Sequence, residues 1–252
     1  KSYVGWQWRA NGSGSSNTAG STATTVSVNT TAGFSIGTYT GTSAVATMGH
    51  GLGAVPGMII VKNLSSGTRK WAVWHQDLSS ASKYLSLNET SAELNDSAVW
   101  NNTLPTNLVF SSAGSGEVNQ GSQNFVFYAF TGKQGYSKFG SYVGNASTDG
   151  TFVYTGFKPA FVMMKNTSNA TSSDWLILDN KRNTFNPESN RLNANTTSTD
   201  TSATWVNTDF LSNGFKLKTS DETINESGNT FIYMAFAEAP LVGTNNVPCT
   251  AR

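Results

Sequence analysis

Short runs of β-branched and aromatic residues recur along the chain, separated by clusters of glycine, serine, asparagine and proline about every ten residues. Apolar and polar residues alternate in some runs, as in residues 215–218 (Phe-Lys-Leu-Lys), which is typical of a half-buried strand. No window of eleven or more residues has an apolar period near 3.6, and the longest helical candidate, residues 90–100, is polar. The pattern predicts an all-β protein with very little helix.

Two runs are apolar at consecutive positions, residues 58–61 (Met-Ile-Ile-Val) and 161–164 (Phe-Val-Met-Met). A strand with this pattern is covered on both faces, so we expect both runs to be central strands. Gly37 and Gly140 each lie inside a strand-like run. A glycine there usually marks a bulge or a close approach of a neighbouring group.

The chain contains an internal repeat. Its blocks keep the same order, and their offset grows from 103 to 106 residues: 36–41 with 139–144, 56–63 with 159–166, 97–100 with 202–205, and 119–130 with 225–236. Self-similarity of this kind is the signature of tandem units. The sequence therefore predicts two tandem β-sandwich domains, of jelly-roll (concanavalin- or lectin-like) type, related by internal duplication.

The repeat also suggests domain boundaries. Residues 3–8 stand ahead of the first copy as residues 125–130 stand ahead of the second, and residues 10–25 are almost entirely small or polar. We expect residues 1–9 to be the last strand of a preceding truncated domain, 10–25 a linker, 26–131 the first β-sandwich repeat, 137–240 the second, and 241–252 a C-terminal tail. The short connection at residues 131–137 indicates that the two copies lie close together.

Composition narrows the range of partners. Charged residues make up 12% of the chain and the net charge is +1, without charge runs, so we expect neither nucleic acid nor an anionic membrane as a partner. No apolar stretch approaches the roughly 20 residues of a membrane-spanning helix. The single cysteine, Cys249, excludes an intrachain disulfide and a cysteine-based zinc site within this sequence.

The usual catalytic motifs are missing. The sequence has no Gly-x-Ser-x-Gly elbow, phosphate-binding glycine loop or His-Glu-x-x-His motif. The candidate carboxylates for glycoside hydrolysis stand in polar, turn-like surroundings without counterparts in the first copy: Asp174 with Asp179, and Asp221 with Glu222 and Glu226. We therefore expect no enzyme, and a polysaccharide depolymerase is disfavoured. His50 and His75 are interpreted as surface or turn residues rather than a metal or catalytic pair.

No cofactor is expected, although calcium is one alternative because the loops of β-sandwich lectins often bind it through Asp and Asn oxygens. The candidate metal ligands are Asn145, Asp149 and Asp179, with Asp174 and Asn180 as further oxygen donors. No EF-hand spacing or repeated Asp-x-Asp pattern supports this site.

The tryptophans fall into two groups. Those present in both copies are explained most simply by a shared core, and they are Trp71 with Trp175 and Trp100 with Trp205. Trp74, Tyr84 and Trp6 have no counterpart, and an exposed aromatic ring beside polar loops is a common platform for a sugar ring. Trp74 and Tyr84 are therefore the candidate carbohydrate-binding residues.

Several strings resemble a domain of uncharacterised function in virion structural proteins of marine tailed bacteriophages. They are residues 3–8 (Tyr-Val-Gly-Trp-Gln-Trp), 33–36 (Gly-Phe-Ser-Ile), 49–53 (Gly-His-Gly-Leu-Gly), 71–75 (Trp-Ala-Val-Trp-His), 140–145 (Gly-Ser-Tyr-Val-Gly-Asn), 156–159 (Gly-Phe-Lys-Pro) and 235–243 (Ala-Phe-Ala-Glu-Ala-Pro-Leu-Val-Gly). The resemblance covers essentially the whole chain from residue 34 onward. It implies a tail-fibre, tail-spike or head-fibre component, and it brings no assigned catalytic or binding residues.

The leading hypothesis is thus a bacteriophage virion appendage module that attaches to the host, through cell-surface glycan, with other virion proteins as partners. By analogy with such appendages we expect a homo-oligomer, a trimer. The alternative is a non-binding structural module, such as a capsid decoration, head fibre or spacer. A binding module should show an exposed aromatic cluster in one copy only, whereas a spacer should show apolar patches where it meets its neighbours.

Overall fold

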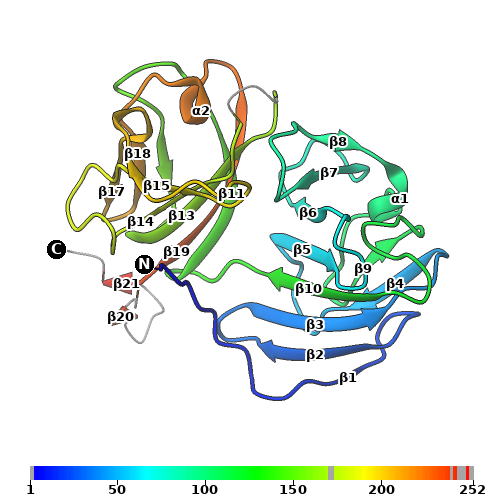
Figure 1. Cartoon of the computed structure of the whole chain (residues 1–252). Coiled ribbons are helices and arrows are strands. Elements are labelled where there is room, and N and C mark those ends of the chain that lie inside the picture. Colours follow the sequence, from blue (N-terminus) through cyan, green and yellow to red (C-terminus); the bar gives the residue numbers. More distant parts are fainter. Residues whose placement is uncertain (1–2, 170–172, 239–240, 243–247, 250–252) are drawn as a thin grey trace.

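The computed structural model describes residues 3–169, 173–238, 241–242 and 248–249 (Figure 1). The strands of the first half are β1 (Ser15–Asn17), β2 (Thr24–Asn29), β3 (Phe34–Thr40), β4 (Ala46–Gly49), β5 (Met58–Asn63), β6 (Trp71–His75), β7 (Lys83–Ser86), β8 (Leu94–Asn95), β9 (Val109–Ser112) and β10 (Asn124–Phe130). The rest of the chain holds β11 (Ser137–Val143), β12 (Phe152–Tyr154), β13 (Pro159–Asn166), β14 (Leu176–Asp179), β15 (Asn190–Asn193), β16 (Thr201–Ser202), β17 (Thr208–Leu211), β18 (Gly214–Leu217), β19 (Thr230–Ala237), β20 (Leu241–Val242) and β21 (Pro248–Cys249).

Helix is confined to three single turns within the described residues, α1 (Ser97–Trp100), a 3-10 turn η1 (Thr204–Val206) and α2 (Glu222–Asn225). The side chain of Asp96 caps the start of α1 and that of Asp221 caps α2, each by accepting a backbone N–H. The all-β prediction is confirmed. No helix in the described part of the chain is long and apolar enough to cross a membrane.

The two halves of the chain lie side by side and contain sheets with the same strand order (Figure 1). The first large sheet has the order β1-β2-β3-β10-β5-β6-β7-β8, and the second has the order β11-β19-β13-β14-β15-β16. Smaller sheets, β4-β9 and β12-β18-β17, accompany them. From β3 and β11 onward, the chain runs through the two large sheets in the same way, and every strand pair is antiparallel. The architecture is β-sandwich-like.

Each half has its own apolar core between its large and small sheets. The first core includes Met48 of β4, Phe110 of β9 and Phe127 of β10, and the second includes Phe215 of β18 and Phe231 of β19. The side chains alternate along each strand, so only one face of the large sheet enters this core.

The opposite faces of the two large sheets meet in a third core that joins the halves. Along β5, Ile59 points into the core of the first half, whereas Met58 and Ile60 point into the joint core. Both faces of this strand are therefore buried, as the consecutive apolar run predicted. Across the joint core the ring of Phe130 lies 6.0 Å from those of Phe139 and Phe236. The halves are in direct contact, in agreement with the short connection between them.

The N-terminal segment does not form the strand expected at residues 1–9, because residues 3–10 carry no regular structure. Instead it packs on the joint core, where the Trp6 ring lies 5.5 Å from Phe161 and the Trp8 ring lies 5.4 Å from Phe236 and 5.9 Å from Phe130. Whether it belongs to a preceding domain stays a prediction.

The expected linker at residues 10–25 is partly sheet. It contains β1 and the start of β2, which pair with each other, and β2 pairs in turn with β3. Of the predicted tail, only residues 241–242 and 248–249 are described, and they form the β20–β21 pair. The remainder of the tail, and residues 239–240 of the second predicted domain, lie outside the described residues.

Candidate functional site

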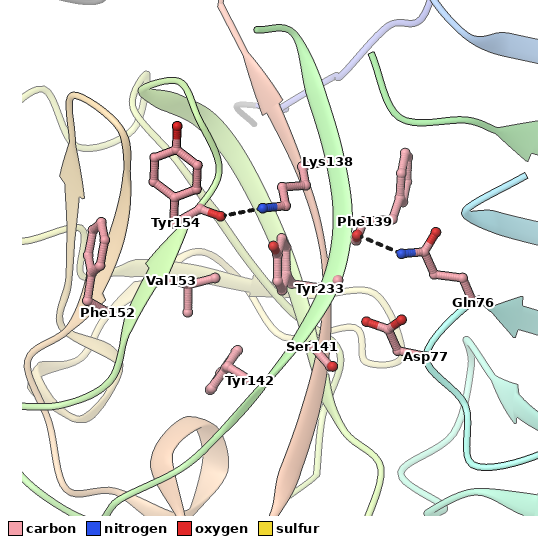
Figure 2. A pocket seen from close by; sticks show the side chains of 11 residues that line it. Gln76, Asp77, Lys138, Phe139, Ser141, Tyr142, Phe152, Val153, Tyr154 and Tyr233 are labelled. Atoms are coloured by element: carbon pink, nitrogen blue, oxygen red, sulfur yellow. Dashed lines mark hydrogen bonds between the residues drawn. The ribbon is translucent and has the colours of Figure 1, made fainter. Parts of the chain in front are cut away.

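A cleft of about 370 Å³ opens in the second half between β11 and β12 (Figure 2). Two residues of the turn after β6 also line it, so both halves contribute to its wall. The lining residues are Gln76, Asp77, Lys138, Phe139, Gly140, Ser141, Tyr142, Phe152, Val153, Tyr154 and Tyr233. This combination of aromatic rings and polar groups is typical of a small-ligand site.

The aromatic wall of the cleft comes from β12. Val153 faces the core, so the alternation of a strand turns Phe152 and Tyr154 outward, where they are 44% and 59% exposed. In the first half the strand that corresponds to β12 is β4, whose buried Met48 is flanked by Thr47 and Gly49. The outward aromatic pair is therefore present in one half only.

Lys138 of β11 holds Tyr154 in place. Its Nζ donates a hydrogen bond of 2.7 Å to the backbone oxygen of Tyr154 and lies 5.2 Å from the centre of the Tyr154 ring. A cation at this distance is attracted by the face of the ring. The position of Tyr154 is thus fixed by its neighbours before any ligand binds.

The opposite wall is the turn after β6. The Nε2 of Gln76 donates to the backbone oxygen of Phe139 over 3.1 Å. The carboxylate of Asp77 lies beside Ser141 in Figure 2, and no hydrogen bond to it is found among the described residues. Burial, with a further contribution from the negative Asp77, raises the pKa of Tyr233 to about 12. The Tyr233 hydroxyl therefore stays protonated.

His75 connects this turn to the second half. Burial lowers its pKa to about 4, so the ring is neutral at neutral pH. Its Nδ1 accepts the N–H of Asp77 over 3.2 Å, and its Nε2 lies 3.2 Å from the backbone oxygen of Tyr233 in the other half. The turn that carries Asp77 is thereby tied to β19.

His50 is held in the same way as His75. Its Nδ1 accepts the N–H of Leu52, and its Nε2 lies 3.1 Å from the oxygen of Thr106. Both histidines are fully buried, which corrects the interpretation of them as surface residues. Both ring nitrogens of each are engaged by backbone groups, so neither is free to bind a metal.

The two predicted carbohydrate-binding residues do not form a sugar platform. Trp74 is 3% exposed and Tyr84 is 9% exposed, and both belong to the core of the first half. Trp74 has no counterpart in the second copy. Its side chain lies on the face of β6 that packs in the core of the first half. The aromatic residues that do face a cleft are Phe152 and Tyr154, and the sequence carries a signal for them. They are outward flanks of a short strand, without an aromatic counterpart in the first copy.

Among the repeated tryptophans, Trp100 and Trp175 are fully buried, as a shared core predicts. The other two, Trp71 and Trp205, are partly buried against the joint core and the second core, respectively. Trp6, which has no counterpart in the second copy, is half-buried and packs edge-on against Phe161 of the second half, with the guanidinium of Arg182 5.9 Å from its ring.

The predicted calcium ligands do not form one site: Asn145 and Asp149 share a loop, where Nδ2 of Asn145 donates to the backbone oxygen of Asp149 over 3.5 Å, but Asp179 lies at the end of β14. The Oδ1 of Asn145 accepts hydrogen bonds from Ser147 and Asn225, and the exposed carboxylate of Asp149 pairs with Lys216 over 2.5 Å. The hydrogen bond and charge of Lys216 lower the pKa of Asp149.

Asp179 lies at the end of β14, where its buried carboxylate pairs with Arg182 over 2.7 Å and accepts the N–H groups of Lys181 and Arg182. Within the described part of the chain no three His, Cys, Asp or Glu residues are grouped to hold a metal. The acceptor atoms of Asn145 and Asp179, and one carboxylate oxygen of Asp149, are thus already used by protein donors, whereas Oδ1 of Asn180 is buried without a hydrogen-bond partner among the described residues.

The other carboxylates considered at the sequence level hold turns in place. Asp174 accepts hydrogen bonds from the side-chain amides of Asn193 and Asn195. Asp221 caps α2, and Glu226 accepts hydrogen bonds from the side chains of Asn169 and Asn229. Asp174 and Asp179 therefore have different hydrogen-bond partners, Asn193 and Asn195 for the first and Arg182 for the second.

A family model described as a domain of unknown function, DUF7483, matches residues 1–240. No curated protein and no solved structure matches the chain.

Proposed function

We propose that this chain, which belongs to the DUF7483 family, is a module of a bacteriophage virion appendage and that it attaches to the host by binding cell-surface glycan in this cleft. The observation that carries the proposal is the outward pair Phe152 and Tyr154, which the corresponding strand of the first half lacks. An aromatic cluster in one copy only is what distinguishes a binding module from a spacer.

The chemistry of the cleft suits a saccharide. The apolar face of a sugar ring stacks on an exposed aromatic ring such as that of Tyr154, which Lys138 holds in position. Sugar hydroxyls would donate to the carboxylate of Asp77, which has no partner among the described residues, and would exchange hydrogen bonds with Ser141. An uncharged sugar fits best, because its hydroxyls can donate to a carboxylate, which accepts hydrogen bonds and donates none.

The resemblance to phage virion proteins supports the setting, and the low charge and disulfide-free sequence agree with a virion location. We further infer that the halves are jelly-roll sandwiches related by duplication, which the shared strand order supports. Other virion proteins are the proposed partners, and a homotrimer is the proposed assembly.

A structural role, as a capsid decoration, head fibre or spacer, is the second candidate. The outer edge of β11, with which no strand of the described residues pairs, favours it, because such an edge is a common place for another chain to attach. A module with this role alone would bind no glycan.

Glycan-array and whole-cell binding by the purified chain test the proposal. The double variant F152A/Y154A should lose at least about tenfold in affinity, because it removes the stacking surface. Asp77→Asn should weaken binding less, since an amide oxygen still accepts hydrogen bonds. Phe185→Ala is the matched control, because Phe185 is 84% exposed and does not line the cleft. Equal binding by F152A/Y154A and the wild type would refute this site, and absence of any glycan binding would favour the structural role.

A further inference from the structure

In the first half, the outer edge of β3 is covered by a strand. β2 pairs antiparallel with β3, with Thr25 opposite Thr38 and Val26 opposite Gly37. The chain just before β2 also closes on β4, because the N–H of Thr22 donates to the oxygen of Thr47 over 3.0 Å. Residues 22–29 therefore fill the space between β3 and β4.

In the second half, the corresponding space is the cleft. Among the strands that the structure describes, β11 pairs with β19 on one side and with none on the other, and β12 pairs with β18 alone. The connection that precedes β11 is a tight turn, closed by paired hydrogen bonds between Lys133 and Ser137, and it is too short to supply a strand. By the strand order of the two sheets, the cleft beside β11 thus corresponds to the position that β2 occupies beside β3 in the first half.

The backbone of β11 leaves hydrogen-bonding groups at this edge. The N–H of Gly144 donates to the backbone oxygen of Asn229. Along β11 the backbone N–H and C=O groups of even-numbered residues therefore point toward β19, and those of Phe139, Ser141 and Val143 point toward the cleft. Gln76 occupies the oxygen of Phe139, and the Thr151 hydroxyl occupies that of Val143. The N–H and C=O of Ser141 have no partner among the described residues. Together they match the paired groups that Thr38 offers to Thr25.

Side-chain space at the edge follows the same pattern. A Cβ atom on Gly37 would lie 2.9 Å from Cγ1 of Val26 and 2.5 Å from the ring of Phe127, so the side chain of Val26 fills the surface of this glycine. A Cβ atom on Gly140 would have Tyr233 alone as its three nearest atoms. Gly140 lines the cleft, and no strand of the described residues pairs with β11 there as β2 pairs with β3.

We propose that this cleft binds an extended segment of a partner polypeptide, which adds to β11 antiparallel, as β2 adds to β3, with a β-branched residue opposite Gly140 and paired hydrogen bonds to Ser141. This interaction goes beyond the glycan binding proposed above. The added strand would lie along β11, facing the rings of Phe152 and Tyr154 on β12 (Figure 2).

A separate polypeptide fits better than a second copy of this chain. In a second copy the segment that suits the corresponding edge, residues 22–29, already covers its own β3, and moving it would leave that edge bare. A whole sheet is also a poor fit, because Gln76 on one side and Phe152 on the other flank the edge of β11.

The first test is binding of a synthetic peptide with the sequence of residues 22–30 (Thr-Ala-Thr-Thr-Val-Ser-Val-Asn-Thr) to the full chain, followed by fluorescence anisotropy. We expect saturable binding. Methylation of the peptide nitrogen at the position of Thr25 blocks the bond to Ser141 and should weaken binding at least about tenfold. Methylation at the next position, Val26, is the matched control, since that N–H points away from β11.

Two variants of the protein complete the test. Ser141→Pro removes the edge N–H and should abolish peptide binding, and its unfolding temperature shows whether it folds. Gln76→Ala, at an exposed position, frees the oxygen of Phe139 and should tighten binding several-fold. Equal affinities of the two methylated peptides, or no binding by the wild type and by Gln76→Ala, would overturn the proposal. So would self-association through this edge that the peptide does not inhibit. Glycan binding by the wild type, measured separately, leaves the proposed function standing when the peptide does not bind.

Discussion

Two buried residues give this protein opposite responses to pH. His75 has its pKa lowered to about 4, and Glu188, in the turn before β15, has its pKa raised to about 8, first by burial and then by the nearby Asp179. Oε2 of Glu188 is buried without a hydrogen-bond partner. Each residue is therefore held in its neutral form near neutral pH.

For His75 the unfolded chain binds a proton below its ordinary pKa of about 6.5, while the folded chain does not until about pH 4. The free energy of unfolding should fall as pH drops through this window. His75→Gln keeps a side-chain amide near Tyr233 but cannot titrate, so its stability should fall less steeply there. Chemical denaturation from pH 7 to pH 4 measures both slopes, and parallel curves for the two proteins would contradict the assignment.

For Glu188 the sign is reversed. Between its ordinary pKa near 4.5 and about 8, the folded chain keeps a proton that the unfolded chain releases, so stability should fall as pH rises through this range. Glu188→Gln removes the ionisation and should be more stable than the wild type at pH 8, by about 1 to 3 kcal/mol. At pH 4.5 the two should be nearly equal. Thermal unfolding at both pH values tests this, and an equal difference at each pH would refute it.

At the scale of strands, β3 and β11 show how one element behaves with and without a neighbour. Gly37 is pressed between Phe127 and Val26, whereas Gly140 approaches Tyr233 and the open cleft. Gly37→Ala must displace a core ring and a strand and should cost about 1 to 3 kcal/mol. Gly140→Ala should cost clearly less, because the hydroxyl end of one side chain can give way. Urea denaturation of the pair tests the difference, and a larger loss in Gly140→Ala would mean that the cleft is packed like the first half.

The sequence predicted the strands that are marked by apolar residues. It did not predict the strands that lack them. Residues 58–61 are buried on both faces, and their pattern says so. β1 and β2 escaped because Ser15–Asn17 and Thr24–Asn29 are rich in hydroxyl and amide side chains, and backbone pairing fixes them in the sheet. Alternation alone also leaves open which face of a strand meets the core, so Trp74 was assigned outward although it points inward.

At the scale of the molecule, the joint core connects the two halves. Phe130 lies within ring contact of Phe34, Phe139 and Phe236, and Nε1 of Trp175 donates to the oxygen of Ser86 across the same boundary over 2.8 Å. The sequence indicated that the copies are close, but the faces through which they meet depend on the path of the chain between them, which the apolar pattern does not encode.

We therefore expect one cooperative unfolding transition for the two halves. Phe130→Ala leaves a cavity in the joint core and should lower the free energy of unfolding by about 3 to 5 kcal/mol without splitting the transition. Calorimetry tests this, together with tryptophan fluorescence, because Trp100 reports on the first half and Trp175 on the boundary. Two separate transitions in the wild type would show that the halves fold independently.

The position of the N-terminal segment has a mechanical consequence. Trp8 touches rings of both halves, and Trp6 is held between Phe161 and Arg182. A pulling force applied at residue 3 is therefore resisted first by these ring contacts and is shared between the two halves, before it reaches the hydrogen bonds between β1 and β2. Tension on this end is therefore carried by the joint core and does not first separate a single strand from its sheet.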